Sequence, residues 1–134
     1  MTVIAFSDLD DTLFQSTRKC PDLKGHIVAA KLPSGDAGAY STPQQQALIS
    51  MMERSVVIPV TGRRTDSLSR VEIPFDGYKV ASHGAIVLDK NDAILPAWRL
   101  VLDEEEPLWR ERMALIQDEL DTYIKLNRLD LRIR

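Results

Sequence analysis

The sequence predicts an α/β fold built on a parallel sheet, and three segments of its first half carry that prediction. Residues 2–7 are apolar on both faces, which is typical of a central strand that helices cover on either side. Residues 42–54 have the apolar spacing of a helix, and residues 55–60 form a second apolar strand. This succession of strand, loop, helix and strand is typical of parallel neighbours in an α/β sheet.

The helix expected over residues 42–54 has a complete start signal. Thr42 supplies an N-cap hydroxyl, Pro43 occupies the first helical position, and Gln45 follows the cap by three residues. This is the pattern of a capping box. In the following strand, Pro59 is unsuited to the middle of a hydrogen-bonded ladder, and we therefore expect it near the end of the strand.

The other expected elements are shorter, apart from one long helix. We expect a hairpin over 26–31 and 37–41, a short helix over 65–70, strands at 78–82, 85–88 and 93–95, a charged linker over 96–106, a long helix from about 106 to 126 and a half-buried strand over 129–134.

Composition and charge narrow the class of protein. The chain has 134 residues, of which 44% are hydrophobic, and this is enough to bury one core. Its net charge of −3 and its scattered basic residues give no support to a nucleic-acid partner. No apolar run approaches the roughly 20 residues that span a bilayer. Cys20 is the single cysteine and cannot form an internal disulfide. With no secretory leader in sight, we expect a cytoplasmic protein that uses neither membrane nor nucleic acid.

Two carboxylates stand where the first strand should emerge into a loop. Side chains alternate along a strand, so Asp8 and Asp10 share one side if the extended geometry continues through Leu9. A carboxylate can attack phosphorus, and a neighbouring acid can protonate the leaving oxygen and later activate water. Asp8 suits the first role and Asp10 the second. A metal ion that neutralises phosphate charge would assist both steps.

The sequence resembles the haloacid dehalogenase-like phosphatases at these residues. The first motif of that family has the form Asp-X-Asp-X-Thr, which Asp8, Asp10 and Thr12 match. The second motif is a Thr or Ser at the end of the next parallel strand, which Thr61 matches after the apolar residues 56–60. Two motifs in the family's order are much more specific than either motif alone.

The resemblance implies a role for each matched residue. Asp8 would be the nucleophile and a metal ligand, and Asp10 would be the general acid and base, with its backbone carbonyl on the metal. Thr61, Gly62 and Arg63 would bind the phosphoryl group, and Gly62 would let the backbone approach it closely. The expected metal ion is Mg²⁺, which favours carboxylate, water and phosphate oxygens.

The order of the later elements is similar to that of the sucrose-phosphatase-like and Cof-like branch, which carries a large cap after the third core strand. Residues 82–85 carry this comparison, although His83 stands where members of the branch usually have Asn. The resemblance implies a Rossmannoid, haloacid dehalogenase-like core over residues 1–100. It also implies the beginning of an α/β cap over residues 101–134, and sugar phosphates as the substrate class.

The resemblance covers only the N-terminal portion of such an enzyme. Family members carry, after the cap, a lysine that steadies the aspartyl-phosphate and an acidic pair that completes the magnesium site, and neither is present in this chain. We therefore expect a truncated core in which the strand over residues 2–7 is an edge. Such an edge invites self-association or pairing with a complementing chain.

Other interpretations of the same residues stay open. Asp8 and Asp10 alone could form a solvated turn, Thr61 could be a simple N-cap, and Arg63 could be salt-bridged at the surface. The leading hypothesis is a magnesium-dependent phosphomonoester hydrolase that acts through an aspartyl-phosphate on small phosphate esters. Its rivals are a non-catalytic fragment that only binds phosphate weakly or assembles with a partner, and a phospho-acceptor without its own hydrolysis step. Because the later motifs are missing, the sequence leaves the status of an enzyme undecided.

Overall fold

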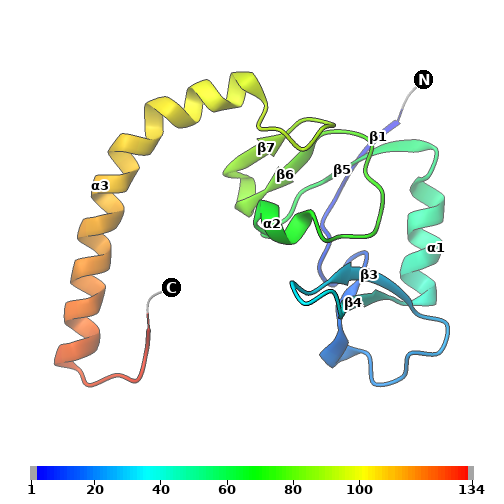
Figure 1. Ribbon diagram of the computed structural model, residues 1–134, viewed down its shortest axis with the longest axis horizontal. Helices are drawn as coiled ribbons and strands as arrows, with labels where there is room; N and C mark the ends of the chain where they lie inside the picture. Colours follow the sequence, from blue (N-terminus) through cyan, green and yellow to red (C-terminus); the bar gives the residue numbers. More distant parts are fainter. Residues whose placement is uncertain (1–2, 133–134) are drawn as a thin grey trace. The chain divides into compact units, whose positions relative to one another are not determined.

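The computed structural model describes residues 3–132 and has a mixed α/β architecture, which confirms the predicted fold class at this coarse level (Figure 1). The chain divides into two compact units, Met1–Leu95 and Pro96–Arg134. Within residues 3–132, the strands all lie in the first unit, and the second contains one long helix.

The first unit is organised around one parallel pair of strands. Strand β1 (Val3–Ser7) pairs in parallel with β5 (Ser55–Pro59), from Val3 opposite Ser55 to Ser7 opposite Pro59. The pairing extends one step further, because Val60 N donates to Ser7 O at 2.8 Å. Both strands were predicted, and Pro59 is the last residue of β5, as expected. The residues that follow the two strands therefore emerge at the same edge of the sheet.

Helix α1 (Pro43–Met52) connects the antiparallel part of the unit to β5. The predicted capping box is present: Gln45 N donates to Thr42 Oγ1 at 3.3 Å, and Thr42 N donates to the Gln45 side-chain oxygen at 2.9 Å. These reciprocal bonds satisfy two backbone N–H groups that a helix start would otherwise leave without partners. The helix ends two residues earlier than predicted, because the chain must turn at Glu53 before β5 begins.

A small antiparallel sheet lies beside the loop that follows β1, residues 8–14, which we call the acidic loop. Strands β3 (Ile27–Lys31) and β4 (Ala37–Ser41) form the expected hairpin, and β2 (Gln15–Ser16), which was not expected, pairs with β4. A 3₁₀ turn, Thr17–Lys19, follows β2. The Ser41 hydroxyl is buried and donates to Leu13 O at 2.7 Å. This bond fixes the end of the acidic loop to the small sheet.

A second hairpin continues from the end of β5. After the short helix α2 (Thr65–Leu68), strands β6 (Lys79–Ala81) and β7 (Ile86–Leu88) pair antiparallel around the turn Ser82–Gly84. Val60 and Val80 form one parallel bridge, and Thr61 N donates to Val80 O at 2.9 Å. The strand predicted over residues 93–95 is reduced to a single bridge between Ile94 and Leu88, because a long helix begins directly after it, at Pro96.

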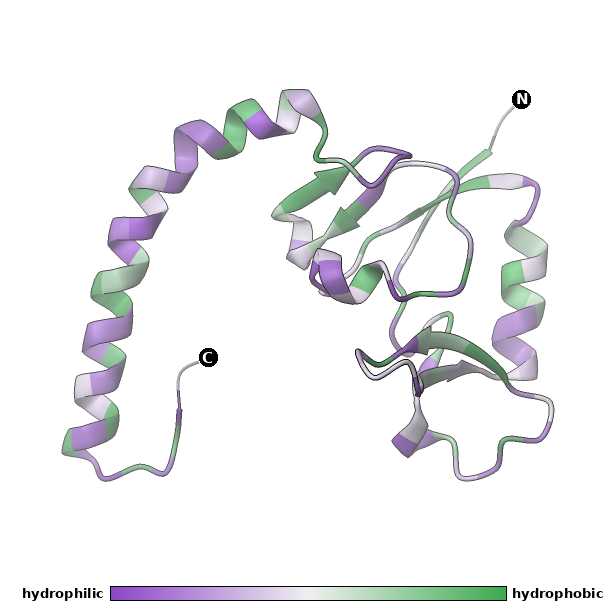
Figure 2. Ribbon diagram, viewed as in Figure 1, coloured by the Kyte–Doolittle hydropathy of each residue, from purple (hydrophilic) through white to green (hydrophobic). Residues whose placement is uncertain are grey.

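The core of the first unit is small, and the acidic loop contributes its largest members. Figure 2 shows the apolar strands of this unit as green segments. The buried apolar cluster consists of Leu9, Leu13, Phe14, Ala29, Ala30, Ala39, Leu68, Ala81 and Leu88. Three of these nine residues belong to the loop after β1, so burial of their side chains anchors the loop to the fold.

Strand β1 is an edge of its sheet, as expected, but helices of the described chain do not cover its two faces, although its apolar sequence predicts such cover. Among the described residues it pairs with β5 only. Val3, Ile4 and Phe6 are 58%, 57% and 71% exposed. An exposed apolar edge of this kind is a template for pairing with another strand.

The second unit corrects two predictions. Helix α3 (Pro96–Leu126) begins at Pro96, so the segment 96–106 is helical and is not a linker. The predicted start at about residue 106 is therefore wrong, and Pro107 lies inside α3, where it removes one backbone hydrogen-bond donor. Residues 129–132 form no strand, because no neighbouring strand in the described chain pairs with them, and residues 133–134 of that prediction lie outside the described part. No residue of α3 is buried.

Within residues 3–132, no helix is both long enough and apolar enough to cross a membrane.

The capping box at α1 predicts a measurable contribution to stability. Thr42→Ala should lower the free energy of unfolding by about 1 kcal/mol, because the Gln45 N–H loses its acceptor. This corresponds to a fall of about 4 °C in the thermal midpoint. Thr42→Ser keeps the hydroxyl and should restore most of the loss. Equal midpoints for the alanine variant and the wild type would contradict the capping role.

Candidate functional site

The acidic loop is a tight turn built on one carbonyl. Leu9 O accepts hydrogen bonds from the backbone N–H groups of Thr12, Leu13 and Phe14 at 3.2, 2.9 and 3.3 Å. Leu9 itself is fully buried, whereas its neighbours Asp8 and Asp10 are exposed. The alternation expected from the sequence therefore continues past the end of β1, with the apolar side chain inward and both carboxylates outward.

The third acid of the loop is held apart from the other two. Asp11 has a φ of +64°, a left-handed conformation that Asp tolerates better than most residues. Its carboxylate pairs with Lys19 Nζ at 2.6 Å. Asp11 therefore belongs to the surface of the loop, and its charge is compensated locally.

Among the residues that the structure describes, the Asp8 carboxylate has one hydrogen-bond partner, which comes from its own motif. Thr12 Oγ1 donates to Asp8 Oδ2 at 3.4 Å, which is at the long end for a hydrogen bond. Ser7 Oγ donates to the Asp8 backbone carbonyl at 2.8 Å. The Asp8 carboxylate is thus exposed and oriented by a single weak donor.

Asp10 is joined to the second motif by a bidentate ion pair. Arg63 Nε donates to Asp10 Oδ2 at 2.7 Å, and a terminal guanidinium nitrogen of Arg63 donates to Asp10 Oδ1 at 2.8 Å. The two residues are 53 positions apart in the chain. Their contact is a direct consequence of the parallel β1–β5 pairing, which brings the two loops to one edge.

Thr61 is buried two residues after the end of β5 and is held by three hydrogen bonds. Its N–H donates to Val80 O, its carbonyl accepts from His83 N at 3.1 Å, and its Oγ1 accepts from Arg63 N at 3.1 Å. Because the hydroxyl oxygen acts as an acceptor, its own proton is directed elsewhere and can be donated. The residue is 3% exposed.

Gly62 lies directly beneath the imidazole of His83. A Cβ added at Gly62 would lie 2.4 Å from His83 Cε1 and 2.7 Å from Nε2. Ser82 and His83 have φ values of +53° and +56°, and Ser82 N donates to Arg63 O at 2.8 Å. The turn Ser82–Gly84 is therefore held in a strained conformation against the loop of the second motif.

The structure thus brings all five predicted site residues to neighbouring loops. Asp8 and Asp10 follow β1, while Thr61, Gly62 and Arg63 follow β5. Sequence reasoning missed the supports of this arrangement, namely Phe14 and Ser67 beside Arg63 and His83 above Gly62. No spacing rule connects these positions, since each contact depends on how separate elements pack.

The donors at the site match a magnesium ion in chemical type. Asp8 offers a carboxylate and Asp10 a backbone carbonyl, and Mg²⁺ is commonly bound through one or two such oxygens together with water and substrate phosphate. The Asp10 carboxylate is engaged by Arg63. Within the described residues, no group of three or more His, Cys, Asp or Glu side chains is placed to hold a metal ion.

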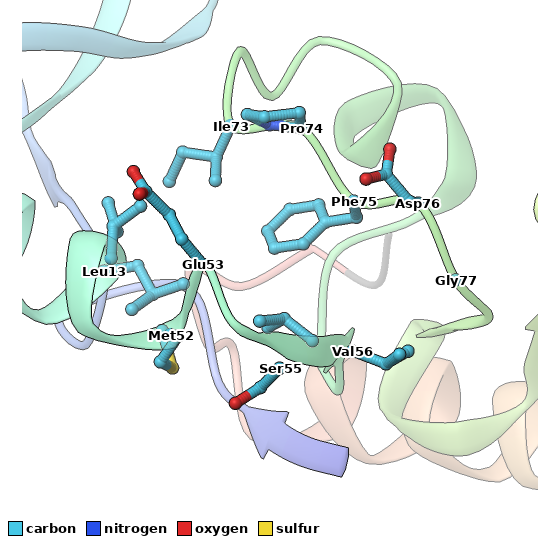
Figure 3. A pocket seen from close by; sticks show the side chains of 12 residues that line it. Leu13, Met52, Glu53, Ser55, Val56, Ile73, Pro74, Phe75, Asp76 and Gly77 are labelled. Carbon is cyan, nitrogen blue, oxygen red and sulfur yellow. The ribbon is translucent and has the colours of Figure 1, made fainter. Parts of the chain in front are cut away.

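A separate apolar cavity of about 340 Å³ lies at the other end of β5 (Figure 3). Its walls come from the end of α1, the first residues of β5 and the loop 73–77, and the Phe75 ring points into it. Leu13 is its one lining residue from the acidic loop. Neither carboxylate of the Asp8–Asp10 pair lines this cavity, so it is distinct from the candidate site.

No protein-family model matches the chain, and no curated protein matches it. Any assignment of function therefore rests on the residues and on their arrangement.

The contact between Gly62 and His83 predicts a non-additive pair of substitutions. Gly62→Ala should lower the free energy of unfolding by about 1 kcal/mol, because the new methyl group must displace the imidazole. In a His83→Ala background the same change should cost less than half as much. Urea denaturation of the four chains gives this coupling. An equal cost in both backgrounds would show that the imidazole does not lie above Gly62.

Proposed function

We propose that the chain carries the nucleophile and the acid–base residue of a magnesium-dependent phosphomonoester hydrolase of the haloacid dehalogenase type. On this proposal the first unit is a Rossmannoid core, α3 begins the cap, and sugar phosphates are the substrate class. The observation that carries the proposal is the meeting of two motif loops at one edge of the β1–β5 pair.

Asp8 is the proposed nucleophile. One of its carboxylate oxygens attacks phosphorus, the bond between phosphorus and the ester oxygen breaks, and an aspartyl-phosphate forms. Two features support this assignment: the Asp8 carboxylate is exposed, and it follows directly from a strand held in register by β5. Thr12 orients one of its oxygens.

Asp10 is the proposed acid and base. Asp10 enters the cycle in its protonated form and donates that proton to the departing ester oxygen in the first step, so the alcohol leaves neutral. It then takes a proton from the water that attacks the aspartyl-phosphate, which releases inorganic phosphate and restores the Asp8 carboxylate. Asp10 stands two residues from Asp8 on the same outward face of the loop.

Thr61 and Gly62 are the proposed contacts of the transferring phosphoryl group. The Thr61 hydroxyl has a proton to donate. At Gly62 the His83 imidazole occupies the space that a Cβ would take, so a phosphoryl group would approach the Gly62 backbone from another side. The ion expected at Asp8 and the Asp10 carbonyl is Mg²⁺, which when bound would neutralise negative charge on those oxygens.

A second candidate function is assembly without catalysis. The exposed apolar side chains of β1 favour it, because a second copy or a complementing chain could pair along that edge. On this alternative the two motifs bind phosphate weakly or not at all. A chain that only accepts phosphate on Asp8, without accelerating its hydrolysis, is the intermediate case.

The test is release of phosphate from p-nitrophenyl phosphate by the purified chain. We expect turnover that requires Mg²⁺, is abolished by EDTA and falls to the buffer background in Asp8→Asn, because the nucleophile is lost. Asp118→Asn is the matched control: it makes the same change on α3, in the other unit, and should leave the rate unchanged.

If the wild type turns over above the buffer background and Asp8→Asn does so at the same rate, the assignment of Asp8 is overturned. If the wild type shows no turnover above the buffer background, assembly without catalysis is favoured.

A further inference from the structure

Arg63 differs from an ordinary surface arginine in the number of its fixed contacts. Its Nε and one terminal nitrogen donate to the two oxygens of Asp10 at 2.7 and 2.8 Å. The other terminal nitrogen donates to Ser67 Oγ at 3.1 Å. All three guanidinium nitrogens therefore have a directed acceptor, and the pair with Asp10 has the parallel, two-bond geometry that orients a carboxylate best.

The flat face of the same guanidinium is also supported. The Arg63 guanidinium carbon lies 4.8 Å from the centroid of the Phe14 ring, within the range of a cation–π contact. Phe14 is fully buried and belongs to the acidic loop that carries Asp10. The loop thus supplies both a carboxylate for the edge of the guanidinium and a ring for its face.

The backbone of Arg63 is fixed as well. Its N–H donates to Thr61 Oγ1, and its carbonyl accepts from Ser82 N. The Arg63 side chain is 19% exposed, while that of the next residue, Arg64, is 84% exposed. Two adjacent arginines therefore have opposite characters: Arg63 is built into the site, and Arg64 is largely in solvent.

We infer that Arg63 is a positioning residue, which fixes the orientation of the Asp10 carboxylate and does not bind the phosphoryl group. This inference rests on the proposed function, because it presumes that Asp10 moves the proton. A residue that transfers protons must be held in one orientation, and the Asp10 side chain is about half exposed, so burial alone does not fix it. The bidentate pair with Arg63 provides that restraint.

The pairing leaves room for the proposed chemistry. A carboxylate has about four lone-pair positions, and Arg63 uses one on each oxygen. One of the remaining positions can carry the proton that Asp10 donates to the ester oxygen, and the same position can later accept a proton from the attacking water. For Arg63 to reach a phosphoryl group with the same nitrogens, it would have to give up two charge-assisted hydrogen bonds to Asp10.

The first experiment separates the two roles by steady-state kinetics on p-nitrophenyl phosphate with Mg²⁺. Arg63→Lys keeps the charge but loses the two-bond fork. For a positioning residue we expect kcat to fall by about 10- to 100-fold with KM nearly unchanged. The inhibition constant of inorganic phosphate should also stay constant. A tenfold rise in both KM and that inhibition constant, with kcat unchanged, would instead identify Arg63 as a phosphate ligand.

Two further variants test the supports of Arg63. Ser67→Ala and Phe14→Leu each remove one contact with the guanidinium while keeping Asp10 and Arg63 themselves. Both should lower kcat by less than Arg63→Lys and leave KM unchanged. Thermal melting of each variant shows whether any loss comes from unfolding.

A second readout does not depend on turnover. In the ¹⁵N-labelled chain, the Arg63 Nε–H should give a resolved signal that Asp10→Ala abolishes and that saturating inorganic phosphate with Mg²⁺ leaves in place. A signal unaffected by Asp10→Ala, or displaced by phosphate, would overturn the inference. If the wild type has no turnover, the proposed function fails, while this signal still decides whether Arg63 holds Asp10.

Discussion

The parallel pairing of β1 with β5 is the constraint on which the site depends. These strands are far apart in the chain but are hydrogen-bonded neighbours in the sheet. Val3 lies opposite Ser55 and Ser7 opposite Pro59, so the two strands end at the same level. Shifting the register by one residue would move every side chain of β1 to the opposite face. Asp8 and Asp10 would then no longer emerge beside the loop that carries Arg63.

The acidic loop is stabilised from inside and oriented from outside. Inside, Leu9, Leu13 and Phe14 are fully buried and bind the loop to the core. Outside, Arg63 contacts both the carboxylate of Asp10 and the ring of Phe14. An exposed ion pair stabilises a fold by at most about 1 kcal/mol. The main effect of the Arg63–Asp10 pair is therefore to orient the Asp10 carboxylate and not to stabilise the fold.

Local patterns in the sequence predicted the elements with strong local signals, and failed where contacts between distant residues decide the outcome. The capping box at Thr42 and the hairpin up to Ser41 depend on neighbours in sequence, and both are present. The predicted start of the long helix, at about residue 106, was wrong. Proline is favourable at the first position of a helix, but Pro107 lies within α3. The site residues followed from two motifs, whereas the Arg63–Asp10 pair requires packing across 53 positions and leaves no mark in the sequence.

The proposed function depends on a covalent bond between Asp8 and phosphorus, which mass spectrometry can detect. After incubation with acetyl phosphate and Mg²⁺, the peptide spanning residues 1–18 should gain the mass of one phosphoryl group, with fragment ions placing it on Asp8. Hydroxylamine should remove it, because it cleaves acyl phosphates. A phosphoryl group on Asp10, on a hydroxyl residue, or on no residue of the chain would contradict the account.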